Sequence, residues 1–206
     1  VTGSLHRREQ ADDTQLHTLG TDAQGAPNLD QRLHSASRNW HDGAMVSTRL
    51  RWRDARDTLE LTPYLSTGHG QTTGSSQLQQ TLGAGAAPYD SAHWTSENRN
   101  TMARLAGSWL HRTDDGARLQ LRFGGSLAES DASTLSQQWS ALGQPLHLRS
   151  DDAQQHDTSF NLSGKVSQLV AERHSLVAGW ELQTNQRSDR RVTLDNGVQQ
   201  LAAFGD

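Results

Sequence analysis

The sequence predicts an all-β fold of antiparallel, up-and-down hairpins, and three observations support this prediction. Apolar and polar residues alternate with period two in short bursts, while helical periodicity is weak throughout. The bursts come in pairs around turns of three or four residues. Long polar stretches separate one pair from the next. Short turns at one rim and long loops at the other are typical of a transmembrane β-barrel, so we expect part of such a barrel, with short periplasmic turns and long extracellular loops.

Three hairpins are expected in succession, and Asp and Gly in their connections suit tight turns. Their ranges and turns are about 44–66 around Asp54–Asp57, about 101–128 around Thr113–Gly116, and about 158–183 around Ala171–Arg173. Residues 1–8 are expected to form the last strand of a preceding hairpin.

The expected long loops cover about residues 9–42, 67–100 and 129–157, which are rich in Ser, Gln, Asp, Gly and His. A compact soluble domain rarely contains three structureless loops longer than about 12 to 15 residues. We therefore expect residues 1–206 to form one partial β-barrel domain. Residues 1–8 contain neither an initiator Met nor the apolar core of a signal peptide, and residues 201–206 carry no cap or targeting signal, so we expect a section of a larger or processed protein.

Composition excludes several classes of protein. The mean hydropathy is -0.78 and no stretch approaches the roughly 18 apolar residues of a membrane-spanning helix. The net charge is -4 without a basic block, so no nucleic-acid partner is expected. The chain has no Cys, which excludes disulfides, thiolate metal sites and cysteine nucleophiles.

One phase of each expected strand is free of charge, although 20% of the chain is charged. A barrel requires this pattern, because one phase meets lipid and the other a polar lumen. A soluble sheet with one wet face would alternate in the same way. The positions of the apolar phase are Val46, Thr48, Leu50, Trp52, Leu59, Leu61, Pro63, Leu65, Ala103, Leu105, Gly107, Trp109, Leu119, Leu121, Phe123, Gly125, Leu127, Phe160, Leu162, Gly164, Val166, Leu176, Ala178, Trp180 and Leu182.

The opposite phase supplies the candidate lumen residues. A guanidinium wall could favour an anionic ligand or the acidic surface of a plug, because arginine pairs bidentately with carboxylate and phosphate. The alternative is ordinary lumen polarity, in which Glu60 and Glu181 pair with the cations. The candidates are Arg49, Arg51, Arg53, Glu60, Arg104, Arg122, Lys165 and Glu181.

Trp52 and Trp109 each precede the short turn of their hairpin on the apolar phase. This position predicts an aromatic girdle at a membrane-water interface, with a core Trp at the end of a sheet as the alternative. Trp40 and Trp94 are candidates for the opposite girdle. Pro63 cannot donate to a strand ladder, so we expect a bulge there.

Two segments resemble barrel strands of TonB-dependent outer-membrane receptors. One is the hairpin Leu50–Arg53 to Leu59–Leu65 with its acidic turn, and the other is His174–Leu182, which is similar to the aliphatic-x-x-Gly-x-Glu strand of that family and precedes an Arg-rich stretch. The resemblance covers about residues 40–191. It implies a bacterial outer-membrane barrel of about 22 strands with a plug, which imports a scarce ligand such as a ferric siderophore with energy from the TonB complex. Its expected partners are outer-membrane lipid, a plug outside this chain, the TonB complex through that plug, and a small anionic or iron-chelating ligand.

No enzymatic motif accompanies this pattern. The glycine-rich stretches at 68–74 and 83–85 lack the Lys-Ser/Thr of a phosphate loop, and there is no nucleophile elbow. No His pair has metal-ligand spacing, whereas Asp12–Asp13 and Asp151–Asp152 could hold a divalent cation at a rim or serve only solubility. We expect no catalytic residue, metal or cofactor. The alternatives to a receptor are another outer-membrane barrel, such as a porin, and a soluble secreted β-rich binding domain.

Overall fold

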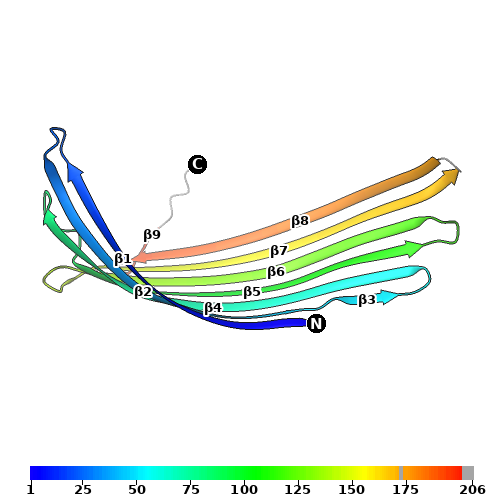
Figure 1. Cartoon of the computed structure of the whole chain (residues 1–206), viewed down its shortest axis with the longest axis horizontal. Coiled ribbons are helices and arrows are strands. Elements are labelled where there is room, and N and C mark those ends of the chain that lie inside the picture. Colours follow the sequence, from blue (N-terminus) through cyan, green and yellow to red (C-terminus); the bar gives the residue numbers. More distant parts are fainter. Residues whose placement is uncertain (172–173, 201–206) are drawn as a thin grey trace.

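The computed structural model describes residues 1–171 and 174–200, and these form one antiparallel sheet (Figure 1). The strands are β1 (Thr2–Thr21), β2 (Pro27–Ser47), β3 (Leu50–Arg53), β4 (Asp57–Leu82), β5 (Ser91–Arg112), β6 (Arg118–Trp139), β7 (Pro145–Ala171), β8 (His174–Asp195) and β9 (Val198–Gln200). Their order in the sheet is β1-β2-β4-β5-β6-β7-β8-β9, and β3 continues the line of β2 beside β4. The expected all-β, up-and-down hairpin architecture is confirmed.

The sheet is open rather than closed into a barrel. Among the described residues, β1 pairs only with β2, and the last strand, β9, pairs only with β8. Figure 1 shows a single curved layer whose β1–β2 end bends upward. No helix among the described residues is long and apolar enough to cross a membrane.

The prediction of three long loops is wrong. Most of residues 9–42, 67–100 and 129–157 continue the strands, so the longest strand, β7, reaches 27 residues. These stretches carry polar residues on both faces, and without an apolar phase they show no period-two pattern. Among the described residues, the connections that replace these loops are residues 22–26, 83–90 and 140–144.

The hairpin turns around residues 54–57 and 113–116 form where expected. In the turn expected around Ala171–Arg173, residues 172 and 173 lie outside the described residues. Gly25, Gly116 and Gly143 occupy equivalent places in three similar five-residue turns, with φ of 83°, 84° and 72°. In each turn the amide of the glycine donates to the carbonyl three residues earlier.

Pro63 causes a break in the neighbouring strand rather than the expected bulge. It pairs in register with Leu105 of β5, while residues 48 and 49 between β2 and β3 leave the ladder. The amide of Thr48 still donates to the carbonyl of Pro63, at 3.2 Å. In an antiparallel strand the N–H and C=O of one residue point to the same side. Pro63 has no N–H, so it offers no donor to the neighbouring strand at the point where that strand is interrupted.

The sheet has almost no interior. Leu78 is the one buried hydrophobic residue among the described positions, at 8% exposure. A soluble domain of this length normally buries most of its apolar side chains around a core. The apolar side chains here lie on the surface, and their position on the sheet defines the candidate site.

Candidate functional site

Strand register places the apolar phase of every expected strand on one face of the sheet. Residues directly opposite in an antiparallel pair share a face, so a row of paired residues crosses the sheet on one side. We name the two sides the Leu61 face and the Glu60 face, after neighbouring residues of β4. One row of the Leu61 face reads Leu50, Leu61, Gly107, Phe123, Leu162 and Leu182.

These rows form an exposed apolar band. We define it as the Leu61-face residues of β3 to β8 between the turns that follow Trp52 and Trp109 and the row that contains Leu65 and Leu127. Along β6 the band runs from Leu119 to Leu127, which is nine residues and about 27 Å at roughly 3.4 Å per residue. Leu65 is 53% exposed and Leu127 61%. At Gly125, which has no side chain, the band is hollowed into an open apolar groove of 840 Å³.

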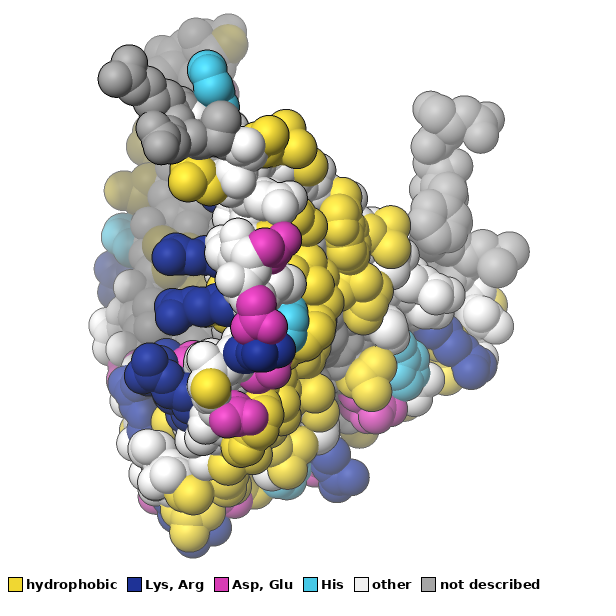
Figure 2. All heavy atoms as spheres, turned by 90° about the vertical axis from the view of Figure 1, so that its right-hand side faces the viewer, with side chains coloured by type: hydrophobic (Ala, Val, Ile, Leu, Met, Phe, Trp, Pro, Cys, Tyr) yellow, Lys and Arg dark blue, Asp and Glu magenta, His cyan; other side chains and the backbone are white. Residues whose placement is uncertain are grey.

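Figure 2, viewed from the end with the turns at 54–56 and 113–117, shows hydrophobic side chains gathered along one side of the sheet. Lys and Arg side chains lie along the other side. The sheet is therefore amphipathic across its thickness at this end.

Three tryptophans lie in one row of the band. Trp52 pairs with Leu59, Leu59 with Trp109, and the row continues through Leu121 and Gly164 to Trp180. Trp52 and Trp180 are 55% and 50% exposed, so neither is a core Trp. Trp180 shares the phase of Trp52 but lies seven residues from the expected turn at 171–173, so its place in the sequence did not indicate a girdle position.

The Trp109 indole has one polar partner and one apolar surface. Its Nε1 donates to Asp57 Oδ1 at 2.9 Å, and the His111 ring is 2.8 Å from the same oxygen. A Trp between an apolar band and a carboxylate suits a position with one apolar side and one wet side.

The Glu60 face carries all of the expected lumen residues. One row contains Arg51, Glu60, Ser108, Arg122, Ser163 and Glu181, and the next row towards the turns contains Arg53 and Lys165. Arg104 lies opposite Tyr64, on the other side of the first row.

The structure brings only some of these residues together. Arg49 lies in the break between β2 and β3, and its Nε donates to Glu60 Oε1 at 2.8 Å. Ser163 separates Arg122 from Glu181, and both, with Lys165, line an open groove of 540 Å³. Among the described residues, no carboxylate lies within 4.0 Å of Arg104 or Arg122. The cations therefore outnumber their acidic partners on this face.

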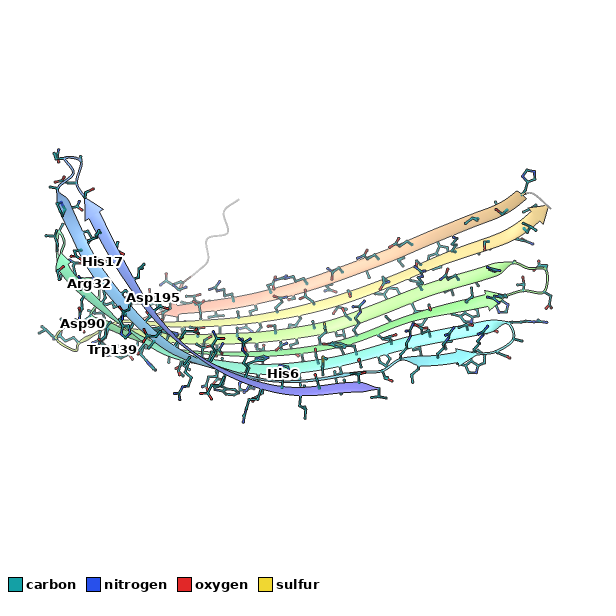
Figure 3. The ribbon with its side chains drawn as sticks, viewed as in Figure 1. His6, His17, Arg32, Asp90, Trp139 and Asp195 are labelled. Atoms are coloured by element: carbon teal, nitrogen blue, oxygen red, sulfur yellow. The ribbon has the colours of Figure 1, made fainter. Side chains whose placement is uncertain are left out.

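Beyond the band the strands continue as a polar extension, formed by the parts of β1, β2 and β4 to β8 on the side away from the turn at 113–117. On β6 the extension runs from Ala128 to Trp139, about 37 Å at roughly 3.4 Å per residue. Figure 3 places His17, Arg32, Asp90, Trp139 and Asp195 at this end of the sheet, and His6 nearer the middle. The amide of Asp90 donates to the Trp139 carbonyl at 2.8 Å, which attaches the 83–90 connection to β6.

Trp40 and Trp94 do not form a second girdle. Trp40 pairs with Gln71 on the Leu61 face, and Trp94 pairs with Gly74 on the Glu60 face. The two indoles therefore lie on opposite sides of the extension, outside the apolar band. The Trp40 Nε1 donates to Gln71 at 2.8 Å, and its ring is 4.9 Å from that of His69.

Neither Asp pair forms a shared cation site, because adjacent strand residues point to opposite faces. Asp13 contacts His34 at 3.0 Å, whereas Asp151 accepts hydrogen bonds from Thr193 and from Arg191 at 2.9 Å. Hydrogen bonds from Thr193, Arg191 and Arg149 lower the pKa of Asp151 to about 2. Within residues 1–171 and 174–200, no group of three or more His, Asp or Glu side chains could hold a metal ion.

No family model matches this chain, and no curated protein is significantly similar to it. The function of the chain is therefore inferred from the arrangement of the two faces of the sheet.

Proposed function

We propose that the chain forms part of the wall of a bacterial outer-membrane β-barrel, in a TonB-dependent receptor that imports a scarce ligand such as a ferric siderophore. The observation that carries this proposal is the apolar band, which is in register across β3 to β8 and exposed to solvent along its whole width. Monomeric soluble proteins rarely expose apolar patches larger than a few hundred Å².

The dimensions of the band support contact with lipid. A transmembrane strand needs about 9 to 11 residues to cross, and β6 supplies nine. The row of Trp52, Trp109 and Trp180 places indole rings across the band, and Trp52 and Trp109 lie close to the short turns. Such aromatic rows mark the interface in barrels of this kind.

The open edges support a wall that further strands complete. In the described part of the chain, β3 and β8 end the sheet across the apolar band, with unpaired backbone groups on their outer sides. Unpaired edges are not tolerated in lipid, because each free N–H and C=O loses its hydrogen bonds there. The plug and the contact with TonB belong, in this proposal, to parts of the receptor other than residues 1–206.

Fluorescence quenching by brominated lipid tests the proposal. Variants that retain either Trp52 or Trp180 as their only tryptophan should be quenched when the protein is reconstituted in brominated phosphatidylcholine. Matched variants that retain only Trp40 or Trp94, both in the polar extension, should not be quenched. A protein that stays monomeric and melts cooperatively in water without detergent contradicts the membrane assignment and favours a soluble binding domain.

The receptor assignment has its own test, since a porin wall would show the same quenching. Ligand uptake through the complete protein should stop in cells that lack TonB. Uptake that continues without TonB would indicate a passive barrel.

We also propose that an anionic ligand or the acidic surface of a plug lies opposite the cations of the Glu60 face. Arg104 is the sharper probe because Arg49 already pairs with Glu60. We expect Arg104→Glu to reduce ligand uptake or plug retention, with Arg49→Glu reducing them less. If reversal at both positions leaves uptake and plug retention unchanged, these cations serve only lumen polarity.

A further inference from the structure

The Glu60 face of the polar extension has a centre without charge. It consists of every second residue of β2 from Gln31 to Met45, of β4 from Ser66 to Gln80, of β5 from Ala92 to Met102 and of β6 from Ala128 to Gln138. None of these residues is Asp, Glu, Lys or Arg, although 20% of the chain is charged. We name this surface the neutral floor.

The opposite face of the same four strands is different. It carries Arg38 and Asp42 on β2, Glu97 and Arg99 on β5, and Asp131 on β6. Solubility alone would place charges on both sides, so the neutral floor is a property of one face rather than of this segment of the sequence.

The charged residues that border the neutral floor nearly balance in sign. On the Glu60 face of β1, β7 and β8 they include Arg8, Arg149, Arg187 and Arg191 against Asp12, Asp151, Asp157 and Asp189. On β8, Arg187 holds Asp189 at 2.8 Å, and Arg191 reaches across to Asp151 of β7 at 2.9 Å. The border therefore offers little net charge to a ligand on the floor.

Trp94 provides a ring surface in the middle of this floor. Its indole lies across Gly74, where the position of an added Cβ would be 2.2 Å from Trp94 Cζ2. The side chain remains partly exposed. Glycine at position 74 thus lets the indole lie close against the sheet with a face towards solvent.

A row of hydroxyl and amide groups runs beside Trp94. It consists of Asn39, Thr72, Ser96 and Thr134. The Thr72 hydroxyl donates to Asn39 at 3.2 Å, and the Ser96 and Thr134 hydroxyls are 3.0 Å apart. A hydroxyl can both donate and accept, so this row can match hydroxyl groups of a ligand in either role.

The chemistry of the neutral floor selects among ligand classes. A nucleic acid or phosphate-bearing ligand needs Lys or Arg, which the floor lacks. A protein interface normally has an apolar, aromatic centre, whereas this floor consists mainly of Ser, Thr, Asn and Gly around one indole. A ligand with an apolar ring face and many uncharged hydroxyls fits both the indole and the hydroxyl row.

We propose that the neutral floor binds an uncharged oligosaccharide, with one sugar ring on Trp94 and its hydroxyls on the Thr72–Ser96–Thr134 row. This inference rests on the proposed function, because it assigns a ligand class to the part of the receptor wall outside the lipid. The Glu60 face then has two parts with different roles: a neutral part in the extension and a cationic part on the strands that carry the band.

Calorimetric titration of the complete protein in detergent micelles tests the inference with maltoheptaose, cellohexaose and laminarihexaose as probes. We expect at least one of them to bind and Trp94→Ala to weaken that binding about tenfold, the loss typical of an aromatic contact. Trp40→Ala is the matched control, because Trp40 lies on the other face of the same extension. We expect it to leave the affinity unchanged.

Binding of none of the three probes, or an equal loss in the Trp94→Ala and Trp40→Ala variants, would overturn the inference. So would binding of an anionic ferric tricatecholate chelate that Trp94→Ala weakens while the saccharides do not bind. Quenching by brominated lipid concerns Trp52 and Trp180, so failure of the membrane proposal and failure of the saccharide proposal are separate results.

Discussion

At the scale of single residues, the polar contacts of the extension carry a dependence on pH. The pKa of Asp151 is about 2, below its ordinary value of 3.8, because Thr193, Arg191 and Arg149 hydrogen-bond to the ionised carboxylate. A lowered pKa in the folded state stabilises the fold above about pH 4, and this contribution is lost as the pH falls towards 2.

Asp151→Asn should therefore lower the free energy of unfolding at pH 7 by about 1 to 2 kcal/mol. It should have little effect at pH 2. Urea titrations in detergent micelles at the two pH values measure this difference. Asp131→Asn on the Leu61 face is the control, and an equal loss at both pH values for Asp151→Asn would contradict the assignment.

The position of the Trp180 indole depends on one neighbouring glycine. Its indole lies over Gly164, where an added Cβ would be 2.4 Å from the indole Cε2 and Nε1 atoms. Gly164→Val should displace the ring and reduce the quenching of Trp180 by brominated lipid, in a variant with no other tryptophan. Ser163→Val, one residue away on the Glu60 face, should leave that quenching unchanged.

At the scale of elements, the sequence predicted strands wherever one face is apolar and the other polar. The six strands on the three expected hairpins, and their shared apolar face, followed from that alternation. The continuation of β4 through residues 67–82 could not be predicted from alternation, because Thr, Gly, Gln and Ser occupy both faces there. The position of Arg49 beside Glu60 also could not be predicted, since it depends on the break opposite Pro63.

Two kinds of turn signal are present at the other end of the sheet. Asn196–Gly197 connects β8 to β9 with φ of 48° and 79°, as a type I′ hairpin turn requires. The glycines of 22–26 and 140–144 repeat the position of Gly116 in the turn that was predicted. Gly25 and Gly143 lie within the stretches expected as long loops, so turns at these two positions would have shortened the loops expected at 9–42 and 129–157.

Gly143→Ala tests the role of these turn glycines. A φ of 72° is strained for a residue with a Cβ, so the free energy of unfolding should fall by about 1 kcal/mol. Gly85→Ala is the control, because no atom lies within 4 Å of its added Cβ and its φ is not in the left-handed region. Equal stability of the two variants in urea titrations would contradict this role.

At the scale of the whole molecule, the proposal requires a change of environment along each long strand. The chain contains no Cys, so each engineered cysteine is the only thiol in its variant. In lipid vesicles, cysteines at Leu121, Phe123 and Leu127 should resist a water-soluble maleimide. Cysteines at Asp131 and Ser133, on the same face of β6 in the extension, should react.

Labelling at the intervening Glu60-face positions completes this prediction. Cysteines at Arg122 and Ser126 should react where a water-filled lumen reaches them. Equal reactivity along both faces of β6 would be inconsistent with a lipid boundary between Leu127 and Asp131.

The pairing order of the sheet has a consequence for how such a wall can change in evolution. Each long strand pairs with the long strands immediately before and after it in the chain. Removing both β5 and β6 would leave β4 opposite β7, with apolar residues still facing the same side. A hairpin is therefore the unit that can be duplicated or lost, and the circumference of the wall can grow or shrink two strands at a time while its amphipathic pattern persists.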